Sequence, residues 1–265
     1  MSRLLTRAAD AYYRRASRLF FRRSLTIRPS VHLISFSFDD FPASALTAGG
    51  SILRNYGLSG TYYASLGLMD QTAPSGQMFS LADLKAAHSS GHEVGCHTYS
   101  HLDSARTATR LYEEDIVKNQ KALNELLPGA RFHTFSYPIS VPRPLTKRVA
   151  GRYFACCRGG GQTFNSGYTD LNNLSAYFLE KSRHDIDQVK SAIDGNRRAA
   201  GWLILATHDV SENPTPFGCT PAFFEAVVRY AVASGACILP VSRALEALTS
   251  GTTNWEPATQ EGKTQ

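Results

Sequence analysis

The chain has 265 residues, of which 43% are hydrophobic and 19% charged, and its formal net charge is +6. This length can bury a sizeable core as one large domain, and the composition excludes a disordered chain. Seven arginines lie within residues 1–23 and the other charges nearly balance, so the basic charge does not argue for a nucleic-acid partner, and none is expected.

The first predicted element is a basic amphipathic helix within residues 1–29. Two interpretations stay open: a helix lying on an anionic membrane surface, or a helix that packs on the domain and exposes a basic face. The segment lacks the apolar core of a secretory signal, and no run of 18 apolar residues exists, so we expect no membrane-spanning helix. The apolar residues at helical spacing are Leu5, Ala8, Ala9, Tyr12, Ala16, Leu19 and Phe20.

Strand and helix patterns alternate from residue 31 onward. Strands are expected at 31–38, 60–66, 93–96, 132–137, 152–156, 174–179, 202–207 and 236–241. Helices are expected at 44–56, 80–90, 107–127, 142–150, 185–200, 221–234 and 242–248, with Ser80 and Ser242 as N-caps. The alternation predicts an α/β domain over residues 30–250, with a parallel sheet covered by helices. The tail 251–265 is polar, without a pattern, and is predicted to be disordered.

A barrel is the expected closure of this sheet over roughly 220 residues. An open doubly wound sheet is the alternative, but no Gly-x-Gly-x-x-Gly follows the first strand.

His97 and His101 lie four residues apart, after the predicted strand at 93–96. One helical turn would put both imidazoles on one face, a spacing that suits one divalent metal. Imidazole favours zinc, cobalt, nickel or iron over magnesium or calcium. The acidic pair Asp39–Asp40 is the best source of a third ligand. The alternative for the two histidines is a solvated helix face or a capped turn.

Four polar clusters follow predicted strands. In a barrel the carboxyl ends of the strands converge on one mouth, where catalytic sites are built. Core packing or surface solvation does not explain four such coincidences, so we expect one functional site there. The clusters are Asp39–Asp40, His97 with His101, Tyr137–Pro138 and His208–Asp209.

The five cysteines form no Cys-x-x-Cys pair, and their number is odd. This pattern predicts a reducing compartment without structural disulfides, hence a cytoplasmic protein. The interfacial interpretation of the basic helix adds peripheral association with the inner membrane face. Cys96 adjoins His97, but we interpret it as a small buried residue rather than a metal ligand.

These motifs resemble those of the polysaccharide deacetylases, the NodB-homology carbohydrate esterases of the family 4 type. Ser37-Phe38-Asp39-Asp40 resembles their first motif, and His97-Thr98-Tyr99-Ser100-His101 matches their second. Ser136-Tyr137-Pro138 lies where their Arg-x-Pro belongs, and an apolar strand ends in His208–Asp209. The resemblance spans 31 to about 248 and implies an irregular (β/α)7–8 barrel and a metal-dependent N- or O-deacetylase.

The resemblance also implies the role of each residue. Asp40, His97 and His101 resemble the metal ligands, and the metal is expected to be zinc, with cobalt or nickel as alternatives. Asp39 resembles the general base and His208 the general acid. The oxyanion and the substrate would be held near Tyr137, Pro138 and the backbone N–H of Ile139.

The chain departs from the family pattern in three places. Phe41 replaces a glycine, which predicts a bulkier cleft floor. Ser136 replaces the arginine that pairs with the base, and we expect Arg158 to supply that charge instead. No partner for His208 is evident, and Glu180 is the candidate.

The leading hypothesis is a metal-dependent deacetylase of a sugar chain or glycan precursor, with an acetylated sugar as its substrate. A second hypothesis keeps the barrel but hydrolyses another non-peptide C–N bond, as in a cyclic amide. A third, motivated by the missing arginine, is a carbohydrate-binding protein with an inactive site. Adjacent carboxylates cannot flank a glycosidic bond from opposite sides, so a two-carboxylate glycosidase is not expected.

Overall fold

The structure is a computed structural model that describes residues 11–13, 15–139 and 141–250. The predicted disorder of 251–265 lies outside the described residues, as do Leu5, Ala8 and Ala9 of the N-terminal helix.

An eight-stranded sheet runs through the centre of the domain, in the order β10-β11-β2-β3-β6-β7-β8, with β12 also paired to β2. All of these pairings are parallel. The central strands β2 and β11 are buried along their whole length, as their apolar runs predict. The strands are β2 (Leu33–Phe38), β3 (Thr61–Ala64), β6 (Glu93–Cys96), β7 (Thr134–Ser136), β8 (Cys156–Arg158), β10 (Tyr177–Phe178), β11 (Trp202–Thr207) and β12 (Cys237–Ile238).

The sheet curls into an irregular barrel, which confirms the predicted fold class. β2 pairs with β11 along one edge, and its other edge is shared by β12 at Leu33 and Ile34 and by β3 at Ser37 and Phe38. At the far edge, Arg158 of β8 forms a bridge with Leu174, just before β10. The barrel is therefore closed only in part on that side.

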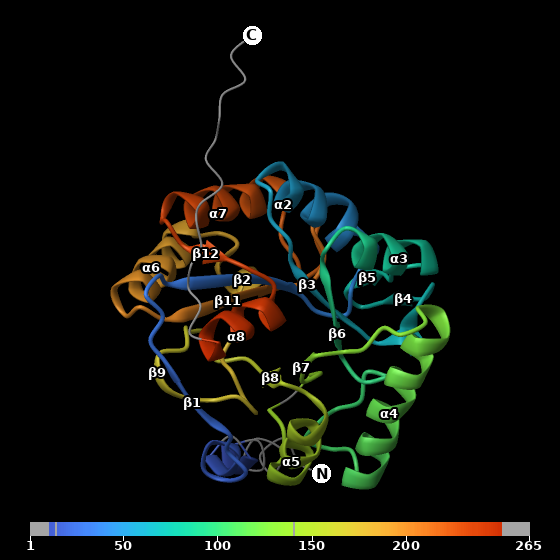
Figure 1. Cartoon of the computed structure of the whole chain (residues 1–265). Coiled ribbons are helices and arrows are strands. Elements are labelled where there is room, and N and C mark those ends of the chain that lie inside the picture. Colours follow the sequence, from blue (N-terminus) through green and yellow to red (C-terminus); the bar gives the residue numbers. More distant parts are fainter. Residues whose placement is uncertain (1–10, 14, 140, 251–265) are drawn as a thin grey trace.

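Figure 1 shows helices around the outside of this barrel. The predicted helix at 80–90 is α3, and Ser80 caps it in a capping box with Asp83. The predicted helix at 44–56 is a π-helix, Ala45–Gly50, followed by α2. The helices are α2 (Ser51–Asn55), α3 (Leu81–Ser89), α4 (Thr109–Leu126), α5 (Pro144–Tyr153), α6 (Ile186–Arg198), α7 (Pro221–Ala233) and α8 (Val241–Thr249), with 3-10 turns at Leu66–Leu68 and Leu179–Ser182.

The amino-terminal ends of the strands are covered by α8, which lies across the barrel in Figure 1. The prediction of Ser242 as its N-cap was wrong, because the helix begins at Val241. The Thr61 hydroxyl accepts from the Val241 N–H, and the Glu93 carboxylate accepts from the Ser242 N–H, each at 2.9 Å. An acidic group at a helix N-terminus is favourable, so Glu93 fixes α8 at this end and leaves the opposite end for the site.

Two other predictions of secondary structure need correction. The predicted strand at 152–156 is displaced, because α5 continues to Tyr153 and β8 begins at Cys156. Four short strands were not predicted, because each is defined by its pairing more than by its own pattern. They are the antiparallel pair β1 (Ser24–Ile27) and β9 (Gly167–Asp170), and the hairpin β4 (Thr72–Ala73) and β5 (Gly76–Gln77).

The N-terminal segment is helical at residues 11–13 and 15–19 and packs beside α5 (Figure 1). The buried Lys147 ammonium donates to the carbonyls of Ser17 at 2.6 Å and Phe20 at 2.9 Å, and pairs with Asp170. A cation at the carbonyl end of a helix is favourable, so this contact anchors the segment. No described helix is long and apolar enough to cross a membrane.

Candidate metal centre and catalytic site

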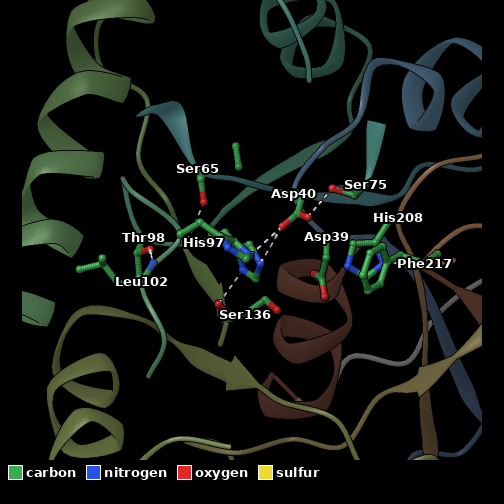
Figure 2. A network of polar contacts seen from close by, with 12 residues as sticks. Asp39, Asp40, Ser65, Ser75, His97, Thr98, Leu102, Ser136, His208 and Phe217 are labelled. Atoms are coloured by element: carbon green, nitrogen blue, oxygen red, sulfur yellow. Dashed lines mark hydrogen bonds and ion pairs between the residues drawn. The ribbon is translucent and has the colours of Figure 1, made fainter. Parts of the chain in front are cut away.

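Three side chains from two strand ends converge at the carboxyl end of the barrel. Asp40 follows β2, whereas His97 and His101 follow β6. Asp40 Oδ1 lies 3.3 Å from His97 Nε2 and 3.0 Å from His101 Nε2 (Figure 2). One ligand atom from each residue lies within 4.8 Å of the others, as a shared metal ion requires.

The segment between the two histidines is a loop, so the predicted helical turn was wrong. Thr98 and His101 have positive φ angles of 60° and 53°. Asp115 of α4 holds the loop, since its carboxylate accepts from the N–H groups of Tyr99 and Ser100, each at 2.8 Å. The two imidazoles meet because of these contacts and not because of helical periodicity.

Asp115 was not identified from the sequence, although a signal was present. The buried face of α4 repeats at helical spacing and includes two polar residues, Asp115 and Asn119. Polar groups on the apolar face of a helix must have partners. Asn119 donates to the Ala64 carbonyl at 2.9 Å and contacts Cys96 Sγ at 3.3 Å. Burial raises the pKa of the Cys96 thiol to about 12, which agrees with its interpretation as a buried structural residue.

The donor set fits a divalent transition metal. Ser136 lies at the position of the missing arginine, and its carbonyl oxygen is 2.8 Å from His97 Nδ1. This contact leaves His97 Nε2 to face Asp40. Asp40 Oδ1 is buried, and no hydrogen bond satisfies it among the described residues. Tetrahedral zinc ligands lie about 3.3–3.6 Å apart, given metal–ligand distances of about 2.0–2.2 Å. The separation of 3.3 Å to His97 lies within that range, and the 3.0 Å to His101 is slightly shorter.

The electrostatics of the three groups suit a cation as well. Burial alone would raise the pKa of Asp40, but the two imidazoles beside it hold that pKa well below its usual range. Burial lowers the pKa of His101, but the adjacent Asp40 carboxylate outweighs burial and raises it. The carboxylate is therefore charged, as a metal ligand must be.

Asp39 has a different partner from Asp40, although the two are adjacent. Arg158 Nη2 contacts Asp39 Oδ1, and both side chains are buried. Burial would raise the pKa of Asp39, but Arg158, together with His97 and His208, lowers it. In Figure 2, Asp39 lies between the imidazole of His97 and that of His208. The prediction that Arg158 supplies the missing charge agrees with this contact.

His208 follows β11 and lies beside Asp39. Its Nδ1 contacts the Phe217 carbonyl at 3.2 Å, so this carbonyl, and not Glu180, is its hydrogen-bond partner (Figure 2). Asp209 holds the loop that carries Phe217, since it accepts from the Thr215 N–H at 2.8 Å. A Cβ at Gly218 would lie 2.1 Å from Asp209 Oδ1, so the loop requires glycine there. The aromatic rings of Phe178 and Phe217 flank the imidazole.

Glu180 interacts electrostatically with His208 and Asp39, and one of its carboxylate oxygens has no hydrogen-bond partner within the described part of the chain. Burial raises the pKa of Glu180 from 4.5 to about 7. The folded protein therefore keeps a proton that the unfolded chain releases between about pH 4.5 and 7. The stability that this proton supports is lost as the pH rises through that window.

The change Glu180→Gln should remove this loss. Relative to the unchanged protein, we expect the variant to gain on the order of 2 kcal/mol in free energy of unfolding between pH 4.5 and pH 8. Urea unfolding of both proteins at the two pH values measures the difference, because titrating groups that are not coupled to Glu180 contribute equally to both. A difference between the proteins that stays constant across the window would contradict the assignment.

The predicted oxyanion segment follows β7. The Tyr137 hydroxyl is buried and donates to the Asn172 carbonyl at 2.9 Å, so it is not available to a substrate. Pro138 is buried, whereas Ile139 is 68% exposed and has a φ of 62°. A positive φ is an outlier for a β-branched residue, and such strain concentrates at functional sites.

Phe41 does not form the cleft floor, so this prediction was wrong. The side chain is fully buried and stacks on Phe79 at 4.7 Å between ring centroids. Asp40 and Phe41 both have positive φ angles, 62° and 60°, which explains why glycine would suit position 41. Because of this turn, the Asp40 side chain faces the two histidines and the Phe41 side chain is buried in the core.

Comparison with known families agrees with this geometry. The sequence model of the family described as polysaccharide deacetylase matches residues 27–153. This part of the chain is similar in sequence to the polysaccharide deacetylases. The matched residues carry Asp39, Asp40, His97 and His101, whereas Arg158 and His208 lie beyond them. No curated protein matches the chain.

Solved structures of this deacetylase type share the fold. A family 4 acetyl xylan esterase from Clostridium thermocellum, in complex with a cobalt ion, is 22% identical over 82% of this chain and 91% of that one, with a TM-score of 0.57. A family 4 carbohydrate esterase from Streptomyces lividans, in complex with acetate, is 18% identical over 78% and 91%, with a TM-score of 0.54. A pseudoenzyme of the same family from Bacillus anthracis is 11% identical over 82% and 66%, with a TM-score of 0.58. At these identities the likeness establishes the irregular barrel alone.

Proposed function

We propose that the protein is a metal-dependent hydrolase that removes acetyl groups from a carbohydrate or a glycan precursor. One observation carries this proposal: Asp40 meets His97 and His101, while the adjacent Asp39 is held by Arg158. A hydrolase of this kind needs one carboxylate on the metal and another that is available as a base. The acetyl group is suggested by the family match and by the acetyl xylan esterase among the solved structures.

In this proposal Asp40, His97 and His101 hold the metal, which we expect to be zinc, with cobalt or nickel as alternatives. When bound, such a metal polarises a carbonyl group and lowers the pKa of water. Asp39 takes the proton of the attacking water, and Arg158 keeps that carboxylate charged beforehand. The N–H of Ile139 stabilises the oxyanion. His208 gives a proton to the leaving amine or alkoxide from Nε2, since Nδ1 faces the Phe217 carbonyl.

The two alternative hypotheses differ from the proposed function in activity or in the bond that is hydrolysed. An inactive carbohydrate-binding protein was motivated by the loss of an arginine at Ser136. The contact between Arg158 and Asp39 removes that motive, although pseudoenzymes occur among proteins of this fold. Hydrolysis of another C–N bond would use the same groups, so substrate comparison must separate it from deacetylation.

Acetate release tests the proposal. The full chain, loaded with zinc or cobalt, is given N-acetylated chitooligosaccharides, O-acetylated xylan and a cyclic amide, and a chelated sample is the control. We expect metal-dependent acetate release from at least one acetylated sugar. Turnover of the cyclic amide alone would favour the second hypothesis. Absence of metal-dependent release from every acetylated sugar would overturn the proposed function.

We further propose that the protein works in the cytoplasm, at an anionic membrane surface. All five cysteines are free and buried, as is typical of a reducing compartment. The N-terminal segment exposes 64% of Tyr12, 72% of Leu19 and 54% of Phe20, next to the exposed Arg15 and Arg18. The packed and interfacial interpretations are thus compatible, because the helix is anchored by Lys147 yet presents apolar and cationic groups outward.

Vesicle co-sedimentation tests the membrane proposal. We expect binding to vesicles with anionic lipid and not to neutral vesicles, and loss of binding in Leu19→Glu with Phe20→Glu. The same binding to both vesicle types, or none, would contradict it.

A further inference from the structure

We propose that Ser75 is a positioning residue for the metal site, which fixes the Asp40 carboxylate so that only one of its oxygens faces the metal. This inference rests on the proposed metal-binding function. Ser75 belongs to none of the motifs found in the sequence. It lies at the tip of the hairpin formed by β4 and β5, between Ala73 and Gly76.

The contact between Ser75 and Asp40 is direct and buried. The Ser75 hydroxyl donates to Asp40 Oδ2 at 2.5 Å (Figure 2). Ser75 is only 1% exposed and Asp40 only 8% exposed. Such burial is unusual for a residue at the tip of a hairpin whose strands have two residues each. The two carboxylate oxygens therefore have different partners: Oδ2 has a hydroxyl, and Oδ1 has the two imidazole Nε2 atoms.

The hairpin is held against the turn that carries Asp40. The Phe79 N–H donates to the Phe41 carbonyl at 3.1 Å, and Pro42 forms an antiparallel bridge with Met78. The rings of Phe41 and Phe79 also stack on each other. The hairpin is thus bonded to the two residues that follow Asp40, so its tip has a fixed position relative to the carboxylate.

This arrangement has a consequence for coordination. A carboxylate with both oxygens unengaged can rotate and bind a metal through both, which raises the coordination number. The Ser75 hydroxyl occupies Oδ2 and leaves Oδ1 as the single donor. Monodentate binding with two imidazoles favours low coordination numbers, as zinc and cobalt adopt, over the many oxygen ligands of calcium. Residues that hydrogen-bond to metal-ligating side chains generally affect the affinity of the site for its metal.

Metal titration of Ser75→Ala in the full chain tests the proposal. We expect affinity for zinc and cobalt, measured by competition with a chromophoric chelator, to fall by about 10- to 100-fold. We also expect the visible absorption of the cobalt-loaded variant to weaken, because a second carboxylate oxygen joins the metal. Thr72→Ala is the matched control, since it removes the hydrogen bond from Thr72 to Gln77 in the same hairpin without reaching Asp40. Affinity and spectrum should be unchanged in the control.

An affinity of Ser75→Ala within twofold of the unchanged protein, with the same cobalt spectrum, would overturn the role of Ser75 alone. Failure of the unchanged protein to bind metal would instead overturn the proposed function. If Ser75→Ala does not fold, X-ray absorption of the zinc-loaded unchanged protein decides the question. One short carboxylate oxygen distance supports the proposal, and a bidentate carboxylate overturns it.

Discussion

The change Asp39→Asn should reduce kcat by about 10²- to 10⁴-fold while the protein still binds its metal. An asparagine side chain fills the same space and can still accept from Arg158, but it cannot take a proton from water. General base catalysis is worth about this factor. The structure separates Asp39 from the metal centre, because Arg158 and not an imidazole contacts its Oδ1. Steady-state acetate release, together with metal content per chain, measures both parts of the prediction.

A matched control lies next to Asp39. Asp40→Asn should weaken metal binding first, because Asp40 Oδ1 faces both imidazoles. The two adjacent substitutions are thus expected to differ in kind: one removes turnover and the other removes the metal. Retention of activity in Asp39→Asn, or an equal loss of metal in both variants, would show that the roles are assigned wrongly.

The second large effect is expected at Arg158. Its guanidinium is 1% exposed, contacts Asp39, and lies 4.6 Å from the centroid of the Tyr63 ring. Arg158→Met leaves a buried carboxylate without its cation. We expect the free energy of unfolding to fall by about 3–5 kcal/mol and acetate release to fall strongly. Chemical denaturation and the acetate assay measure the two effects.

The double variant Asp39→Asn with Arg158→Met separates charge from packing. If the unpaired carboxylate causes the instability, removing its charge should restore most of the lost stability without restoring activity. Losses that simply add would show that Arg158 acts through its packing on Tyr63. Unchanged activity in Arg158→Met would exclude it as the replacement for the arginine absent at Ser136.

The sequence predicted the parts of the site that have local signals. Asp39, Asp40, His97, His101 and His208 each follow a predicted strand, so the barrel topology brings them to one end. Arg158 was found by a different route, from the charge that Asp39 would need. Its position on β8, next to β7, explains how it reaches the place left by Ser136.

The sequence did not predict the contacts that depend on distant segments. The conformation between His97 and His101 is set by Asp115, 15 or more residues away, and not by local helix propensity. Ser75 lies in a polar hairpin whose docking cannot be read from its own residues. The apolar residues of the N-terminal helix left two interpretations open, because its packing depends on Lys147, which anchors the helix while Leu19 and Phe20 stay exposed.

Anomalous X-ray diffraction from crystals of the zinc-loaded protein tests the central claim most directly. We expect one peak at the carboxyl end of the barrel, about 2.0–2.2 Å from Asp40 Oδ1, His97 Nε2 and His101 Nε2. Asp39 should remain on Arg158. A peak that includes Asp39 as a ligand, or zinc bound elsewhere with these three side chains unliganded, would contradict the account.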